Sequence, residues 1–382
     1  MIPAGKIFCP VCGSVFTELF YKNGTKSTGA LLMRHPFTNL LDVKPYDPSS
    51  STTPSEEITL ITPKHLDGNE FPEHIKVQFK GDTEPLTMLR CCPKCTKQTT
   101  ALYPEYGKYP LFVVMAMGDV GAGKTAWLGA TGYISNLAAV NQANYPYALD
   151  SVTLSTSTQQ SEATILDSRG NTKLLRIKSR NDKRVVADVL LLDSAGELFK
   201  NICPENTKLW DFLAKNPDFP GADAFVFLQP ADAHSTAGEK MFNGCYSKGV
   251  FTNKPVAVVV NRLDKILESN QVPAVQDISK TKMVPWFSAD TFDSPTSYLP
   301  EKMCFRMTLE HAVATQLLSY ALQSEFVNSQ GFLVQSCVDK KVTKKDDAGR
   351  DIPFLERNYD HSINVMDPLL WVLNQLHIFP VE

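Results

Sequence analysis

The chain has 382 residues and a net charge of -3, with 43% hydrophobic and 21% charged residues. This length allows about two or three domains of ~150 residues each, and the composition is that of an ordinary globular protein with a sizeable core. The net charge is weakly negative, so the chain lacks the overall positive charge typical of nucleic-acid-binding proteins. No nucleic-acid partner is therefore expected. No apolar run approaches the ~18 residues that would span a membrane.

The chain has nine cysteines, an odd number, and two pairs of them have C-x-x-C spacing. This pattern suits metal thiolates in a reducing compartment better than disulfides. The N-terminus lacks the apolar segment of a signal peptide. We therefore expect a cytoplasmic protein.

The paired cysteines predict a zinc site. Cys9 and Cys12 form one C-P-x-C knuckle, and Cys92 and Cys95 form another. Two such turns supply the four thiolates of a tetrahedral, structural Zn²⁺ site, as in zinc ribbons. The spacer, residues 13–91, has 79 residues, far more than the usual ~15–20. A redox pair or free thiols are the alternative, and Cys91 is a possible substitute ligand.

The long spacer is interpreted as a β-rich insertion between the knuckles. Residues 59–62 and 75–79 have the composition of strands, whereas residues 47–55 read as a loop. We predict a zinc-ribbon-like domain over residues 1–105. Its expected role is structural or the docking of a partner.

A phosphate-binding loop follows the apolar run of residues 111–116. The pattern G-x-x-x-x-G-K-[ST] is complete, and Ala126 then opens a predicted helix that ends near Gln142. Backbone N–H groups of such a loop, together with the helix N-terminus, bind phosphate oxygens. Lys124 would reach the outer phosphates and the Thr125 hydroxyl would ligate Mg²⁺. The loop comprises Gly118, Asp119, Val120, Gly121, Ala122, Gly123, Lys124 and Thr125.

An acidic residue follows the second strand of a predicted hairpin. Residues 172–178 alternate as an exposed strand, and residues 184–192 become increasingly apolar until Asp193. Asp193 would hold Mg²⁺ through water at the same sheet edge as the phosphate loop. Gly196 completes D-x-x-G, and its N–H could approach a γ-phosphate. Between the first helix and this hairpin, residues 144–171 show little periodicity and occupy the place of a nucleotide-sensing loop.

Two further buried strands are predicted over residues 222–229 and 255–260, with a helix around 236–248 between them. The second strand ends in N-R-L-D, from Asn261 to Asp264. The phosphate loop, D-x-x-G and N-x-x-D, each at a strand end and in this order, resemble a TRAFAC-class GTPase domain. The resemblance covers residues 108–377.

The resemblance implies an α/β fold, the three-layer P-loop NTPase sandwich with a mostly parallel sheet, and a domain over residues 106–382. It also implies that Asp264 pairs with guanine N1 and N2 while Asn261 braces the loops. Arg262 replaces the usual Lys and can stack on a base through its guanidinium plane.

The last nucleotide-binding segment has two candidates. Residues 332–337 form a strand ending in Ser336 and Cys337, between a predicted long helix over 301–326 and a predicted amphipathic helix over 364–376. This order favours Ser336 and Cys337, with Ser288 as the alternative. Insertions are then expected near residues 266–300 and 338–362.

Two features of the expected GTP hydrolysis are unusual. The position that often holds a water-orienting Gln after D-x-x-G is Glu197, whose carboxylate would be repelled by phosphate, so slow hydrolysis is expected. Thr172 is the favoured switch threonine for the Mg²⁺ shell, and Thr164 is the alternative. No arginine finger is assigned.

A narrower resemblance links the chain to bacterial double-GTPase-type proteins, associated with conflict or defence modules. It rests on the zinc knuckles, D-S-A-G-E, N-R-x-D and the terminal D-P-L-L-W-V-L helix. It implies a regulatory GTPase that uses GTP, Mg²⁺ and Zn²⁺ and works with other proteins. An ATP-using P-loop NTPase and a nucleotide-binding scaffold without turnover are the alternatives.

Overall fold

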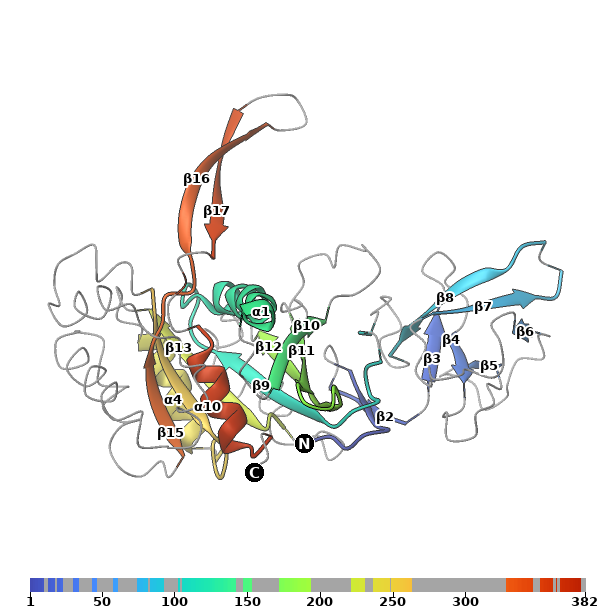
Figure 1. The fold of residues 1–382 in the computed structure, drawn as a ribbon, viewed down its shortest axis with the longest axis horizontal. Coiled ribbons are helices and arrows are strands. Elements are labelled where there is room, and N and C mark those ends of the chain that lie inside the picture. Colours follow the sequence, from blue (N-terminus) through green and yellow to red (C-terminus); the bar gives the residue numbers. More distant parts are fainter. Residues whose placement is uncertain are drawn as a thin grey trace, which may run out of the picture.

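Two larger β-sheets organise the chain, as the ribbon in Figure 1 shows. The computed structural model describes residues 1–9, 13–17, 19–22, 30–33, 43–46, 58–60, 74–81, 83–92, 102–103, 105–141, 147–152, 172–193, 221–230, 236–247, 249–262, 328–345, 351–359, 362 and 365–378.

The central sheet has seven strands in the order β10-β11-β12-β9-β13-β14-β15. Neighbours from β12 to β15 pair in parallel, whereas β11 is antiparallel to both β10 and β12. The strands are β9 (Leu111–Met117), β10 (Tyr147–Val152), β11 (Thr172–Ser179), β12 (Val185–Asp193), β13 (Ala224–Pro230), β14 (Val256–Asn261) and β15 (Ser329–Leu333).

Both faces of the parallel strands are covered, which explains their continuous apolar sequences. On one face, α1 (Lys124–Asn141) and α10 (Asp367–Gln375) pack against the sheet through a core that includes Trp127 and Leu369. On the other face lies α4 (Thr236–Ser247), where Phe242 contacts Phe227 with ring centroids 5.1 Å apart. This mostly parallel sheet with helices on both faces fits a P-loop-like α/β domain, as the sequence predicts.

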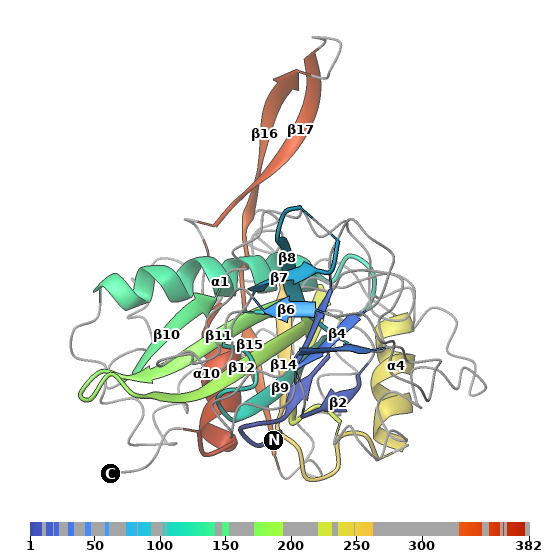
Figure 2. The same ribbon diagram turned by 90° about the vertical axis from the view of Figure 1, so that its right-hand side faces the viewer.

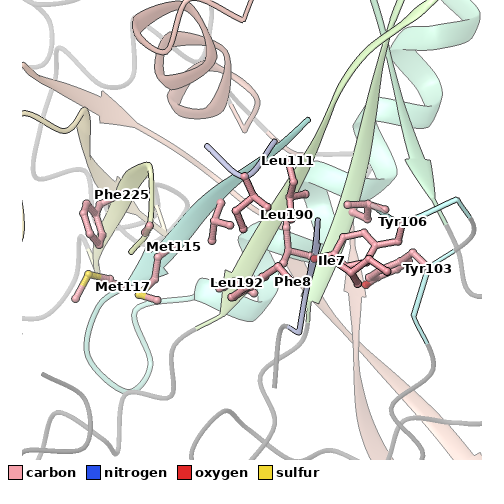
Figure 3. Close-up of a cluster of buried hydrophobic side chains, with 14 of the residues drawn as sticks. Ile7, Phe8, Tyr103, Tyr106, Leu111, Met115, Met117, Leu190, Leu192 and Phe225 are labelled. Atoms are coloured by element: carbon pink, nitrogen blue, oxygen red, sulfur yellow. The ribbon is translucent and has the colours of Figure 1, made fainter. Parts of the chain in front are cut away.

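The N-terminal residues share the core of this second face. Ile7 and Phe8, in β1 (Ile7–Phe8), lie beside Leu190 of β12 in Figure 3 and belong to the same buried cluster. β1 pairs with β2 (Val15–Phe16). The first residues are therefore packed against the central sheet rather than separated from it.

A six-stranded antiparallel sheet in the order β5-β4-β3-β8-β7-β6 lies at one end of the molecule (Figure 1). The strands predicted over 59–62 and 75–79 agree with two of its members. Its strands are β3 (Leu19–Lys22), β4 (Ala30–Met33), β5 (Val43–Tyr46), β6 (Ile58–Leu60), β7 (His74–Phe79) and β8 (Leu86–Cys91).

Two predictions about the hairpin region were wrong. Residues 144–171 were expected to form a loop, but β10 lies among them; this edge strand was not predicted because it is only half buried and shows little alternation. As β10 pairs with β11, the strand predicted as exposed is an inner strand whose residues Leu174–Ile177 are buried. Arg176 can lie there because it is paired with a carboxylate, as described below.

The charged insertion after β15 contains an antiparallel hairpin of β16 (Val338–Lys345) and β17 (Asp351–Asn358). Figures 1 and 2 both show it projecting away from the central sheet, on the side of α1. Among the described helices, none is long and apolar enough to cross a membrane.

Candidate functional site

The phosphate-loop residues connect the end of β9 to the start of α1. Gly118 has φ 146° and Gly123 has φ 84°, values that L side chains rarely adopt. A Cβ added to Gly118 would lie 2.3 Å from the Leu228 carbonyl oxygen, and one on Gly123 would lie 2.3 Å from Asn261 Nδ2. Both glycines are therefore required by backbone conformation and by close neighbours.

The Lys124 side chain folds back onto the phosphate loop. Its Nζ donates hydrogen bonds to the carbonyl oxygens of Gly118 (2.8 Å) and Asp119 (2.9 Å). The first helical hydrogen bond runs from Trp127 N to Gly123 O, which leaves the N–H groups of the first turn without an intrahelical partner. A concave loop with a buried ammonium group and a helix N-terminus is suited to bind phosphate.

Thr125 and Asp193 lie together, although 68 positions separate them. The Thr125 hydroxyl donates a 2.7 Å hydrogen bond to Asp193 Oδ2. β12 and β9 pair in parallel with Asp193 opposite Ala116, so the carboxylate reaches the start of α1. Asp193 is only 5% exposed. A hydroxyl and a carboxylate oxygen at this edge are suitable ligands for Mg²⁺.

Asn261 joins the phosphate loop to the last predicted nucleotide segment. Its Nδ2 donates to the carbonyl oxygen of Ala122 at 3.1 Å, and its Oδ1 accepts from the Ser336 hydroxyl at 2.8 Å. The carbonyl oxygen of Ser336 accepts in turn from the Ser362 hydroxyl at 2.7 Å. Asn261 and Ser336 are both buried. The structure therefore brings three chain segments together through one amide side chain.

Arg262 and Cys337 flank this amide network. Arg262 has φ 67°, a left-handed conformation that is uncommon for a non-glycine residue and often occurs at functional sites. Cys337 is a partly exposed cysteine that forms no disulfide. Both follow the carboxyl ends of neighbouring parallel strands. Asp264, two residues further along the chain, lies outside the described residues.

Several other predicted residues also lie outside the described residues. These are Gly196, Glu197, Cys12, Cys95, Thr164 and Ser288, together with the helix predicted over 301–326. Their assigned roles stay predictions.

Thr172 is described, and its hydroxyl already has a partner. The Tyr103 hydroxyl lies 2.9 Å from both the carbonyl oxygen and the hydroxyl oxygen of Thr172. Burial raises the pKa of Tyr103 above its ordinary value, and the hydrogen bond to Thr172 offsets part of this shift. Thr172 pairs with Leu192, next to Asp193, so it lies at the predicted edge of the sheet.

The described residues on either side of the first cysteine knuckle are hydrogen-bonded to each other. Cys9 N donates to Ser14 O at 2.8 Å, and Gly13 N donates to Cys9 O at 2.9 Å, with Gly13 at φ 72°. Cys9 and Cys92, the two predicted zinc ligands that the structure describes, are both buried. No group of three or more His, Cys, Asp or Glu side chains that could hold a metal ion occurs in the described ranges.

Sequence reasoning missed a buried ion pair within the central sheet. Its aspartate, Asp188, pairs with the first residue of β9, Leu111, and so lies away from the site's edge. Arg176 of β11 binds Asp188 of β12 at 2.9 Å and Glu105 at 2.7 Å. Burial raises the pKa of Asp188, and the hydrogen bond and charge of Arg176 offset this in part. The available signal was an aspartate within the apolar run of residues 185–192, because such a carboxylate needs a cationic partner.

Comparisons with known proteins add the following. No family model matches the chain, and no curated protein matches it. Among solved structures, a mutation variant of SsGBP has 10% identity and a TM-score of 0.25, covering 59% of this chain and 49% of that chain. Sup35 complexed with GMPPNP has 12% identity and a TM-score of 0.24, covering 60% of this chain and 38% of that chain. The chain thus spans less than half of either structure, and the function must be argued from the site itself.

Proposed function

We propose that the protein is a Mg²⁺-dependent GTP-binding protein that hydrolyses GTP slowly to GDP and phosphate and acts as a switch towards other proteins. The observation that carries the proposal is two sets of hydrogen bonds at one edge of the sheet. Thr125 with Asp193 forms one set, and Asn261 with Ala122 and Ser336 forms the other. The first set suits a metal-bound phosphate and the second suits the base-binding end of a nucleotide.

In the proposed reaction, Lys124 exchanges its two loop carbonyl partners for β- and γ-phosphate oxygens and offsets their charge. Thr125 and Asp193 would hold Mg²⁺, which supplies Lewis-acid stabilisation of the phosphates when it is bound. The orphan N–H groups of α1 orient the phosphate chain. The remaining catalytic residues of the proposal are Gly196, as a γ-phosphate sensor, and Glu197.

Guanine selection is assigned to Asp264, with Arg262 stacking on the base and the backbone of Ser336 and Cys337 facing it. Asn261 holds these segments against the phosphate loop through the contacts measured above. The pairing chemistry is selective because adenine offers no matching pair of donors. ATP use would leave Asp264 without a role in base selection.

The N-terminal cysteines are proposed to hold a structural Zn²⁺ through Cys9, Cys12, Cys92 and Cys95. The turn at Gly13 and the burial of Cys9 support this, because thiolates at a tight knuckle are typical of closed zinc sites. We propose that this region docks a partner protein, in line with a conflict or defence module. Metal analysis of the wild type and of Cys9→Ser tests the zinc part.

Calorimetric titration of GTP, GDP and ATP with Mg²⁺ into the full chain tests the main proposal. We expect GTP and GDP to bind, ATP to bind at least tenfold more weakly, and Lys124→Ala to bind none of them measurably. Asp264→Asn should shift the preference towards xanthosine nucleotides. Equal binding of ATP and GTP would favour an ATP-using NTPase, and GTP binding without phosphate release above the Lys124→Ala blank would favour a scaffold.

A further inference from the structure

The β16–β17 hairpin interrupts the chain directly after the proposed base-binding segment. β16 begins at Val338, two residues after Ser336, and β17 ends at Asn358. The hairpin projects away from the central sheet in both Figure 1 and Figure 2. The chain therefore leaves the site at Ser336, forms the hairpin and returns at Tyr359. The contacts of the returning residues decide how firmly Ser336 is held.

Ser362 joins the two ends of the hairpin at its base. Its hydroxyl oxygen lies 2.7 Å from the Ser336 carbonyl oxygen and 2.7 Å from the Tyr359 carbonyl oxygen. Its backbone N–H donates to the same Tyr359 carbonyl oxygen at 3.0 Å. One residue thus connects the point where the chain leaves the site to the point where it returns. None of the nucleotide-binding motifs includes Ser362.

Tyr359 in turn lies against α1, the helix that begins in the phosphate loop. Its ring packs on Tyr133, with ring centroids 5.8 Å apart. A Cβ added at Gly129 would lie 2.3 Å from the Tyr359 hydroxyl oxygen, so the ring occupies space that a glycine leaves open. Gly129 and Tyr133 are four residues apart and share one face of the helix. The returning chain is therefore packed on α1, and Trp127 Nε1 adds a 2.9 Å hydrogen bond to the Val365 carbonyl oxygen.

Ser336 is held at two of its atoms. Its hydroxyl donates to Asn261 Oδ1 at 2.8 Å, and its carbonyl oxygen accepts from Ser362. In a trans peptide group the Ser336 carbonyl and the Cys337 N–H lie in one plane and point in opposite directions, and the described residues contain no cis peptide bond. Fixing the carbonyl therefore fixes the direction of the N–H. The bond from Ser362 thus orients the backbone that the proposed function places against guanine.

Resting on the function proposed above, we propose that Ser362 and Tyr359 are positioning residues that hold the base-binding segment against the guanine nucleotide and so set the rate at which GDP leaves. Asn261 joins this segment to the phosphate loop, and Tyr359 joins it to α1, which continues from the loop. The base-binding end and the phosphate-binding end are thereby held together by two separate sets of contacts. Loss of the contacts at Ser362 or Tyr359 lets the segment move away from the base, and GDP then stays bound for a shorter time.

Dissociation of a fluorescent GDP from the full chain, chased with excess GDP, tests the role of Ser362. We expect Ser362→Ala to speed dissociation by about two- to tenfold, the range that one lost hydrogen bond gives. Ser362→Thr, which keeps the hydroxyl, should restore the wild-type rate. Single-turnover hydrolysis of bound GTP should be unchanged, because the lost bond lies at the base-binding segment. A general loss of stability would change both rates.

Ser135→Ala is the matched control for the lost hydroxyl. It removes a buried 3.0 Å hydrogen bond from a serine hydroxyl to the Gly132 carbonyl oxygen, within α1 and away from the base-binding segment. It should lower stability in urea unfolding by as much as Ser362→Ala does, and it should leave the release of GDP unchanged.

Gly129→Ala tests Tyr359 without changing the base-binding segment. The new methyl group would meet the Tyr359 hydroxyl and displace the ring, whereas alanine by itself favours a helix over glycine. We expect GDP to leave at least twofold faster. Gly132→Ala is the control on the same helix, because its nearest neighbours are atoms of the flexible Lys173 side chain at 3.3 Å or more. It should release GDP at the wild-type rate.

The outcomes separate the inference from the function on which it rests. If Ser362→Ala releases GDP within twofold of the wild-type rate, the inference is wrong, and if Gly129→Ala alone does so, Tyr359 is not a positioning residue. Faster release that Ser135→Ala and Gly132→Ala show equally would also overturn the inference, because it would reflect a general loosening of α1. If the wild type itself binds neither GTP nor GDP, the proposed function fails instead.

Discussion

The hydroxyl group of Tyr103 lies 2.9 Å from the hydroxyl oxygen of Thr172, next to the end of β12. Tyr103 belongs to the segment that follows the second cysteine knuckle, and Thr172 is the favoured switch threonine. The contact holds the Thr172 hydroxyl, so any turn of this side chain towards Mg²⁺ has to compete with Tyr103. The contact thus connects the cysteine-bearing part of the chain with the proposed metal site.

Replacing Tyr103 by Phe should release the Thr172 hydroxyl. We expect GTP with Mg²⁺ to bind several-fold more tightly, while the free energy of unfolding falls by about 1 kcal/mol because one hydrogen bond is lost. Titration at fixed nucleotide and varied Mg²⁺ measures the first effect, and urea unfolding measures the second. Lower stability with unchanged Mg²⁺ dependence would remove Thr172 from the metal ligands.

Asn261→Ala should weaken nucleotide binding by loosening the loop. The substitution removes the donor to Ala122 and leaves the buried Ser336 hydroxyl without its acceptor. An unsatisfied buried polar group costs about 1–3 kcal/mol, so we expect an approximately 5- to 150-fold loss of GTP affinity and lower stability. Asn181→Ala, in the exposed turn between β11 and β12, is the control. Unchanged GTP affinity in Asn261→Ala would show that the network does not support the site.

Removing one partner of the buried Arg176–Asp188 pair should be strongly destabilising. Arg176→Met leaves Asp188, which is 1% exposed, as a buried charge, and this should cost about 3–5 kcal/mol in the free energy of unfolding. Arg184→Met, at an arginine whose side chain is 77% exposed, should change stability by less than about 0.5 kcal/mol.

The double variant Arg176→Met with Asp188→Leu distinguishes an unpaired charge from lost packing. It should recover most of the stability that Arg176→Met loses, because apolar replacements of a buried pair are often neutral or stabilising. If the double variant is as unstable as Arg176→Met, the loss comes from packing or from the Glu105 contact instead.

Stability should fall at alkaline pH. Burial raises the pKa of Cys245 from 9.0 to about 12, and burial also raises the pKa of Tyr106. In the unfolded protein these two groups lose their protons at lower pH than in the folded protein. Their contribution to the free energy of unfolding is therefore complete below the unfolded pKa values and is lost as the pH rises towards the folded pKa values. Urea unfolding at about pH 8 and pH 10.5 should show the decrease. Cys245→Ala should make it smaller by about 1–2 kcal/mol, and an unchanged decrease would mean that this thiol does not contribute.

Local sequence patterns were sufficient for the inner parallel strands β9, β12, β13 and β14 of the central sheet, whereas the strand predicted over 332–337 begins and ends earlier, as β15. The apolar runs that became β9, β12, β13 and β14 are buried on both faces, so their composition alone identifies them. The phosphate loop was equally readable, because Gly118 and Gly123 occupy conformations that a side chain would oppose. β10 was missed because an edge strand with half-buried residues has no strong periodicity.

The sequence by itself determined the motifs: the glycine loop with Lys124 and Thr125, the strand-terminal Asp193 and Asn261, and the cysteine knuckles. Only the tertiary structure decided which of these groups meet. Parallel pairing brings Asp193 to Thr125, and Asn261 to both Ala122 and Ser336, because the carboxyl ends of neighbouring parallel strands lie at one edge. Tyr103 and Arg176 could not be assigned from sequence, since their roles depend on partners that strand register and burial across the sheet bring to them.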